Sequence, residues 1–436
     1  MHGRARRVLV LTSLLAVCAG SAALAGCDAP ERVAPPAVSG TAERTQSAGS
    51  DLDSWLERLD TTHPEPFHAV TRADFVAALA DLESRLADLT PAQAVVGVMR
   101  VAALLSGERD GHQFALPQPD AEWPLLPLRV YEFADGVFVT EARAPYEDMR
   151  GVRLVAIEGR PITEVLDELE PLVPRDGPAT VPAFRPSFLL RTVVLRGLGI
   201  VPDEDDPAIE LTVADDRGER TVVVEPITFD QHVSWAGEFG AWRLPARSDL
   251  RYLSTLEETM SYEYLPETRS LYVRYTEVAA AGQVVSALRE RTGQADVGRI
   301  VLDVRQNPGG DNHHNAALVD LLVERRSVPT VVLTDRVTFS AASNLVTDIE
   351  QATDAVFVGE AMGGGLNFWN DVDFVQLDAL PVPMMIGVST RYWQRAEPAD
   401  PRLTIEPDVP LPVRATDFFA GRDPALEAAL GALPSP

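Results

Sequence analysis

Residues 328–352 read VPTVVLTDRVTFSAASNLVTDIEQA. The apolar run 328–333 predicts a buried strand, a short polar turn follows it, and residues 341–352 have the pattern of a helix. Ser340 lies where the turn meets the helix. A negative charge that developed beside this serine would face the unpaired N–H groups and the positive end of the helix dipole. The position suits a nucleophile, but it equally suits a serine that only caps the helix.

The same alternation of strand and helix extends in both directions from this stretch. Candidate strands cover residues 269–275, 299–305, 329–336 and 355–361, and candidate helices cover 282–293, 315–326 and 341–352. This order predicts βαβ units and a mainly parallel, buried sheet. The predicted fold class is therefore α/β.

The residues before position 107 favour a small helical bundle. Apolar residues recur at helical spacing behind the N-cap candidate Thr71, at Phe75, Leu79, Leu82, Leu86 and Leu89. Thr90 and Gln93 have the spacing of a capping box for a second helix, which Gly107 ends.

The middle of the chain is richer in strands. Residues 136–142 and 152–159 read as strands, and Glu158-Gly159 predicts a turn after them. A short helix follows, with one apolar face made of Ile162, Val165, Leu166, Leu169 and Leu172. The order of strand, tight turn and helix resembles the second half of a PDZ domain.

The N-terminus has the layout of a secretory signal. A basic segment, RARR, precedes a short apolar run, and small residues lead to Cys27. The stretch Leu24-Ala25-Gly26-Cys27 resembles a bacterial lipoprotein box, which implies cleavage before Cys27 and lipid attachment to its sulfur. An ordinary cleaved signal is the alternative. Residues 27–50 are rich in small and polar residues and predict a flexible tether.

Composition limits the chemistry that the chain can perform. The formal charge is −27, so binding of nucleic acid through a broad basic patch is not expected. The sequence contains no lysine, which rules out a Walker loop, a Ser-Lys pair and a Schiff base. Arginine stays protonated, so the general base must be a histidine or a carboxylate.

The segment VLDVRQNPGGDN at 301–312 ends a strand in a Gly-Gly turn. Such a turn lets the backbone approach a ligand with exposed N–H groups, as half of an oxyanion hole, but a plain strand-to-helix turn would look similar. His112, in SGERDGHQF at 106–114, is the candidate base. His313 and His314 are its rivals. Because DNHH at 311–314 has no second ligand cluster, no metal or other cofactor is expected.

Taken together, these motifs resemble the C-terminal processing peptidase family, and most closely its tricorn-core branch. They are RDGH at 109–112, DVRQNPGG at 303–310, TFSAA at 338–342 and GEAMGGG at 359–365. The closing segments RYWQ, IEPDVP and GRDPALEAAL are also similar to that branch. The resemblance extends over about residues 55–430 and implies a crotonase-like ββα catalytic core.

The resemblance also implies roles for individual residues. Ser340 would attack the scissile carbonyl and His112 would be the general base. The backbone N–H groups of Gly309 or Gly310 and of Ala341 would hold the oxyanion. The branch uses a serine beside the histidine and a distant glutamate to orient it. This chain has Gly111 beside the histidine, and Glu397 is the candidate orienting residue, followed by Asp110 and Asp400.

The expected organisation is a lipoprotein signal peptide (1–26), a tether (27–50), a helical domain (51–115), a β-rich, degenerate PDZ-like region (116–235) and an α/β serine peptidase domain (236–436). The expected substrate is a peptide or an unfolded protein. The expected location is the bacterial cell envelope, lipid-anchored through Cys27 on the extracytoplasmic face of a membrane. A catalytically silent binding protein on the same fold is the alternative function.

Overall fold

The computed structural model describes residues 41–118, 123–202, 207–237, 240–280, 282–294 and 296–431. The predicted signal peptide, the lipidation of Cys27 and the first part of the tether lie outside the described residues. None of the helices that are described is both long and apolar enough to cross a membrane.

Three helices form the N-terminal part of the molecule, and their caps follow the sequence pattern. They are α2 (Thr41–Thr62), α3 (Arg72–Arg85) and α4 (Pro91–Ser106). The side chain of Thr71 accepts the N–H of Asp74, and Thr90 and Gln93 form the predicted capping box. Residues 41–50, predicted to be a tether, belong to α2 instead, because Ala48 and Leu52 are buried in the core of this part.

An antiparallel sheet follows, in the order β2-β3-β4-β6-β7. Its strands are β2 (Leu128–Phe133), β3 (Gly136–Ala142), β4 (Arg153–Ile157), β6 (Ile209–Asp215) and β7 (Gly218–Val224), and β5 (Arg160–Pro161) pairs with β4. Four helices accompany it: α5 (Ile162–Leu169), α6 (Thr180–Leu189), α7 (Thr192–Gly197) and α8 (Phe229–Ala236). Four predicted apolar residues of α5 and Leu172 beyond it are buried, as the pattern indicated. The likeness to a PDZ domain stays a prediction.

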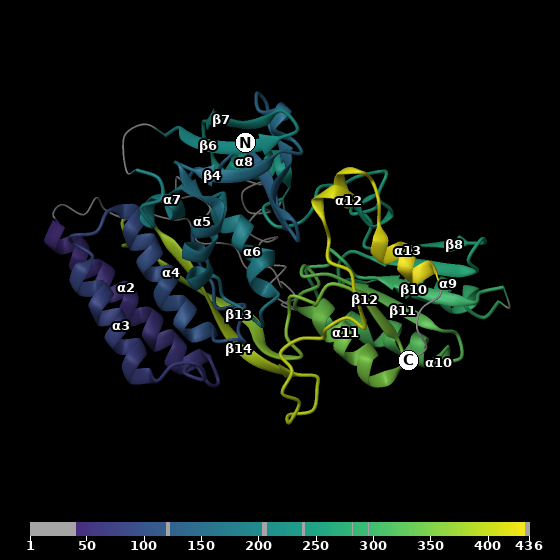
Figure 1. The fold of residues 1–436 in the computed structure, drawn as a ribbon. Coiled ribbons are helices and arrows are strands. Elements are labelled where there is room, and N and C mark those ends of the chain that lie inside the picture. Colours follow the sequence, from purple (N-terminus) through teal and green to yellow (C-terminus); the bar gives the residue numbers. More distant parts are fainter. Residues whose placement is uncertain are drawn as a thin grey trace, which may run out of the picture.

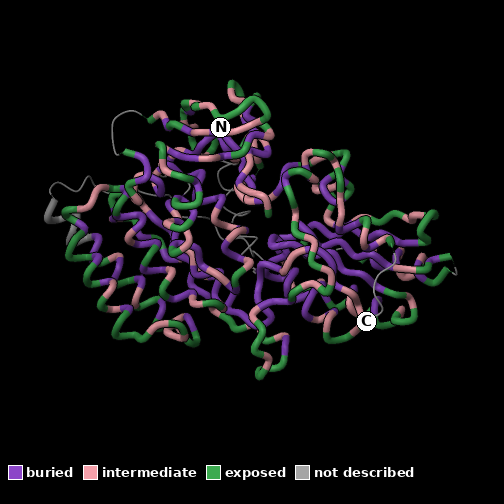
Figure 2. Tube along the Cα trace, viewed as in Figure 1, coloured by how far each residue is buried: buried purple, intermediate pink, exposed green. Residues whose placement is uncertain are grey.

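The second sheet has the order β15-β12-β11-β10-β9-β8. Its strands are β8 (Met260–Leu265), β9 (Ser270–Tyr275), β10 (Arg299–Asp303), β11 (Thr330–Thr334), β12 (Val356–Gly359) and β15 (Val409–Pro410). All neighbouring strands are parallel except β8, which runs antiparallel to β9 at one edge. Figure 2 shows that the central strands are buried. The parallel, buried sheet predicted from the sequence is therefore confirmed.

Helices cover both faces of this sheet (Figure 1). On one face α9 (Gly282–Arg291), α10 (Asn315–Glu324) and α11 (Ala341–Ala352) share an apolar core with Leu302 and Val332. On the other face α13 (Pro424–Leu430) packs against Val301 and Val331. Successive strand residues point to opposite faces, which explains why these strands read as continuous apolar runs. A short helix, α12 (Ala415–Phe419), precedes α13.

A long hairpin links the two halves of the molecule. It consists of β13 (Asn367–Leu377) and β14 (Met384–Gln394), and β1 (Ala115–Pro117) extends it to three strands. Leu377 and Ile386 of this hairpin belong to the same apolar core as Trp55 and Leu59 of α2. The hairpin, which belongs to the predicted catalytic domain, thus packs on the N-terminal helices (Figure 1). The predicted domain borders stay a prediction.

We expect Leu59→Ala to lower the free energy of unfolding by about 2–5 kcal/mol, because it would leave a cavity in that shared core. Leu104→Ala is the matched control: this leucine of α4 is 42% exposed, and its loss should change stability by less than about 0.5 kcal/mol. Urea unfolding of both variants measures the difference. Equal effects would mean that α2 does not pack as described.

Candidate active site

Ser340 lies in a strained turn between β11 and α11. Its backbone has φ 53° and ψ −124°, a conformation that costs a non-glycine residue on the order of 1–3 kcal/mol. Hydrogen bonds within the turn stabilise it, since the carboxylate of Asp335 accepts the N–H groups of Val337 and Thr338 at 3.0 and 3.1 Å. The Ser340 side chain makes no capping bond to α11. Its placement therefore differs from that of an ordinary N-cap serine.

The Gly-Gly turn packs directly against this serine. A Cβ atom at Gly309 would lie 2.7 Å from the Cβ of Ser340, so only glycine permits the approach. The two loops are also hydrogen-bonded, because the carbonyl of Asn307 accepts the N–H of Phe339 at 3.1 Å. Two segments that the sequence analysis linked by motif alone thus form one backbone cradle.

The predicted oxyanion donors are not equally available. The N–H of Gly309 donates to Oδ1 of Asn307 at 2.9 Å and is already used within the turn. The N–H groups of Gly310 and Ala341 have no acceptor within the part of the chain that the structure describes. Ala341 is the first residue of α11, where the backbone N–H has no partner in the helix. Gly310 and Ala341 are therefore the better pair of donors.

His112 is brought to the serine by the loop between α4 and β1. Its ring is 1% exposed and stacks on Phe339, with centroids 4.8 Å apart, and on Phe368 at 5.9 Å. Burial lowers the pKa of His112 to about 4, although the charge of Asp110 acts in the opposite direction. The ring is therefore neutral near pH 7. The main chain of Trp369 also favours the protonated ring, although neither ring nitrogen meets strict hydrogen-bond geometry among the described residues.

The hydroxyl of Ser340 is not hydrogen-bonded to His112 in this structure. Its Oγ accepts the side-chain N–H of Asn370, on β13, at 3.0 Å. The hydroxyl hydrogen thus remains free for donation. The imidazole stacks on Phe339, the residue before the serine, so the histidine loop packs against the serine turn although His112 and Ser340 are 228 positions apart in the sequence.

The carboxylate that faces His112 belongs to Asp176. Oδ2 of Asp176 lies 4.0 Å from Nδ1 of His112. Asp176 Oδ1 accepts the N–H of Gly111, beside the histidine. Burial raises the pKa of the Asp176 carboxyl well above its usual range, while that N–H acts against the rise.

Glu397, the orienting residue predicted from the sequence, is elsewhere. It is exposed, in the turn after β14, and the structure gives its carboxylate no bond to His112 among the described residues. Asp400, a second candidate, pairs with Arg402 at the surface. Both positions lie beyond the end of the buried hairpin, so the orienting role of Glu397 stays a prediction that this structure does not support by a contact. Asp176, in a proline-rich loop, offered only an Asp-Gly pair as a signal, which many turns share.

Asp110 holds a separate buried cluster behind His112. Its carboxylate accepts Ser389 Oγ–H at 2.7 Å and lies 3.1 Å from Nε2 of His63 and 3.7 Å from Nε2 of His68. Two imidazoles and a carboxylate are possible metal ligands. The N–H of Glu65, however, donates to Nδ1 of His63 at 3.0 Å. In the neutral ring Nε2 then carries the proton and donates to Asp110, which does not fit a metal ligand.

The rival histidines lie at the surface. The exposed ring of His313 pairs with Asp311 through Nδ1 and Oδ1 at 2.7 Å, and His314 lies near the other oxygen of the same carboxylate.

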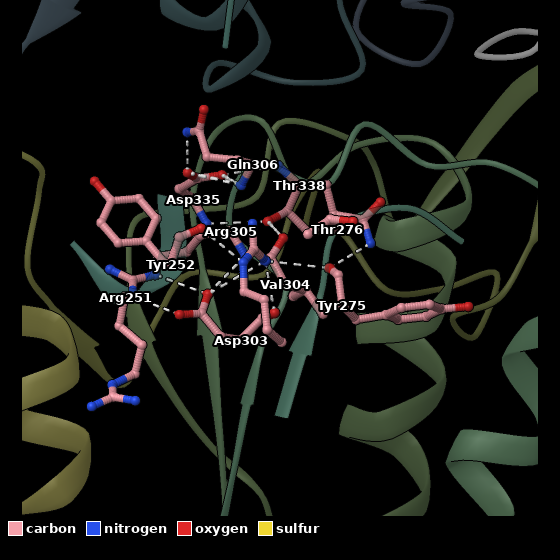
Figure 3. A network of polar contacts seen from close by, with 12 residues as sticks. Arg251, Tyr252, Tyr275, Thr276, Asp303, Val304, Arg305, Gln306, Asp335 and Thr338 are labelled. Carbon is pink, nitrogen blue, oxygen red and sulfur yellow. Dashed lines mark hydrogen bonds and ion pairs between the residues drawn. The ribbon is translucent and has the colours of Figure 1, made fainter. Parts of the chain in front are cut away.

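Figure 3 shows the polar network that braces the glycine loop. Arg305 pairs with Asp303 at 2.6 Å and with Asp423, at the start of α13, at 2.8 Å. Its guanidinium lies 3.9 Å from the centroid of the Tyr252 ring. The main-chain N–H and the amide of Gln306 donate to Asp335, so the brace continues to the serine turn.

Solved structures with a similar fold were found at low sequence identity. A CPAF point mutant superposes with a TM-score of 0.61 at 13% identity, over 89% of this chain and 97% of that one. Mature CPAF in complex with lactacystin gives a TM-score of 0.57 at 12% identity, over 87% and 96%. The photosystem II D1 C-terminal processing protease covers 89% and 96% at 15% identity, with a TM-score of 0.40.

No protein-family model matches the sequence, and no curated protein is significantly similar to it. The CPAF superpositions confirm the mixed α/β fold. The C-terminal processing peptidase family remains what the motifs resemble. The crotonase-like ββα core remains a prediction in its details.

We expect Asp335→Ala to lower the free energy of unfolding by about 2–4 kcal/mol, because several buried N–H donors would lose their acceptor. Asp354→Ala, at an exposed aspartate after α11, is the control and should change stability by less than about 0.5 kcal/mol. Denaturant unfolding compares the two. An equal, small effect for both variants would show that the junction does not depend on this carboxylate.

Proposed function

We propose that this protein is a serine-type peptidase that cleaves peptide bonds through an acyl-enzyme on Ser340. The observation that carries the proposal is the strained serine at the start of α11, which packs against the glycine cradle and follows Phe339, the residue on which the buried ring of His112 stacks. The resemblance of the motifs to C-terminal processing peptidases supports peptides as the substrate class.

His112 would act as the general base. Its ring is neutral and desolvated, and Nδ1 faces Asp176, so Nε2 is the nitrogen left for the serine proton. As Ser340 Oγ bonds to the carbonyl carbon, its proton passes to Nε2, and the imidazolium then donates it to the leaving amine. A water molecule repeats the sequence to release the acyl group. No lysine is present to take this role.

Asp176 would orient the ring and stabilise the imidazolium. A gap of 4.0 Å is longer than a hydrogen bond, but catalytic bonds commonly tighten only when substrate is bound. The Gly310 and Ala341 N–H groups would hold the carbonyl oxygen as it becomes negative.

The N-terminal motif supports a proposal for the location of this peptidase. We propose that Cys27 is lipidated and holds the catalytic part at the extracytoplasmic face of a bacterial membrane. Lipid attachment through two acyl chains makes such anchoring stable. Mass spectrometry of the purified envelope protein, with and without Cys27→Ser, tests this separately from catalysis.

Treatment with a fluorophosphonate probe should label Ser340, and Ser340→Ala should abolish both labelling and peptide hydrolysis. The reason is that the probe reacts only with an activated serine. Intact-protein mass spectrometry measures the adduct, and Ser343→Ala, at a buried serine one turn into α11 that bonds Thr338, controls for nonspecific loss. A wild-type protein that binds peptides but is neither labelled nor active would instead favour the silent binding protein.

Asp176→Asn should lower kcat by at least about a hundredfold with little change in KM, since an amide cannot stabilise the imidazolium. Glu397→Gln should leave kcat within about twofold, because the exposed Glu397 carboxylate does not contact the ring. Steady-state kinetics of both variants, with circular dichroism to verify folding, gives the comparison. A larger loss of kcat in Glu397→Gln than in Asp176→Asn would instead indicate that Glu397 orients His112.

A further inference from the structure

We propose that Asn370 is a catalytic residue of this site, whose side-chain N–H stabilises the negative charge that develops on Ser340 Oγ. The inference rests on the proposed function and adds a donor that the sequence motifs did not indicate. Nδ2 of Asn370 lies 3.0 Å from Oγ, and Asn370 is 3% exposed. A donor that already touches the reacting oxygen needs no rearrangement before it can act.

The backbone around Asn370 keeps this donor in place. Asn370 pairs with Arg391 in the β13–β14 ladder, and Asp371, at φ 56°, follows it. The carboxylate of Asp371 accepts the indole N–H of Trp393 at 3.0 Å, which holds the kink. The Asn370 side chain is therefore carried by a long paired hairpin rather than by a mobile loop.

The same strand also contacts the loop that carries the histidine. The N–H of Trp369 donates to the carbonyl of Arg109 at 2.8 Å, and the ring of Phe368 stacks on His112. Three consecutive residues of β13 therefore make these contacts: Phe368 touches the imidazole, Trp369 the histidine loop and Asn370 the serine. Strand β13 sets the position of the base and of the nucleophile together.

The hydrogen-bonding capacity of the serine hydroxyl is compatible with this role. Oγ has one hydrogen to donate and two lone pairs. Asn370 uses one lone pair, the hydrogen can be donated to His112, and the second lone pair can attack the carbonyl carbon. When His112 removes the hydrogen, Oγ gains negative charge, and the N–H of Asn370 is aimed at that charge in a water-poor site.

The position of Asn370 has a matched counterpart in the same region. Asn344, one turn along α11, is also fully buried, and its amide donates to Oδ1 of Asn312 at 2.9 Å. Oδ1 is unpaired in both Asn344 and Asn370 among the described residues. The two residues differ in that the Asn370 amide touches the nucleophile. Asn344→Ala therefore controls for the loss of a buried amide.

The test measures the second-order rate of fluorophosphonate labelling, which reports the reactivity of Ser340 without a peptide substrate. Asn370→Ala should lower this rate about a hundredfold, the effect of removing one donor from developing charge. The kcat for peptide hydrolysis should fall by a similar factor with KM nearly unchanged. Asn344→Ala should keep both values within about threefold of wild type, whatever its melting temperature.

Asn370→Asp adds a second, sharper comparison. It keeps the shape of the side chain and an oxygen acceptor, but it replaces the donor by a group that repels negative charge when ionised. Above pH 7 its labelling rate should be no higher than that of Asn370→Ala. A rate close to wild type for Asn370→Asp would show that only shape or the oxygen matters, and would overturn the proposal.

The result also separates this inference from the proposed function. If wild type is not labelled at all, the peptidase proposal fails and the role of Asn370 fails with it. If wild type is labelled and Asn370→Ala is labelled at the same rate, only the role of Asn370 is refuted. If Asn344→Ala loses reactivity as strongly as Asn370→Ala, the effect belongs to packing and the inference is again wrong.

Discussion

The carboxylate of Asp335 joins the ends of two neighbouring parallel strands, and the candidate site depends on that junction. Strands β10 and β11 are parallel, and Asp303 lies opposite Leu333, so the loops that follow the two strands begin at the same edge of the sheet. Asp335 then accepts N–H groups from Gln306 on one side and from the serine turn on the other. Because Asp335 binds both loops, Ser340 can keep its strained backbone conformation, with φ at 53°.

Burial gives the site its electrostatic character. The His112 ring is stacked on aromatic rings, and Asp176 is fully buried. Desolvation lowers the pKa of the imidazole and raises the pKa of the carboxyl, so each group is pushed toward its uncharged form. A proton that arrives on the imidazole changes this balance, because an imidazolium beside a carboxylate forms an ion pair. The same low-polarity surroundings strengthen the bond from Asn370 to the serine oxygen.

The histidine and the serine come from different halves of the chain, and the β13–β14 hairpin brings them together. It packs on α2 in the N-terminal core, yet its first residues contact the serine turn and the histidine loop. A change in how α2 packs would therefore be transmitted to the site through one continuous pair of strands.

Local patterns in the sequence were sufficient for most elements and for part of the site. The caps at Thr71 and Thr90, the alternating strands and helices, and the position of Ser340 at a helix start follow from hydrogen bonds and apolar spacing within a few residues. The start of α2 was missed because residues 41–50 have little apolar periodicity of their own, and their helix is stabilised by packing on the core.

The sequence by itself determined the local conformations. It also determined which side chains could react, namely a serine at a helix start and several histidines, with no lysine in the chain. Only the tertiary structure decided which carboxylate faces His112, which glycine keeps a free N–H, and that Asn370 touches the nucleophile. These contacts join residues far apart in the chain. They depend on how the hairpin and the proline-rich loop pack on the sheet, and no short-range pattern encodes that packing.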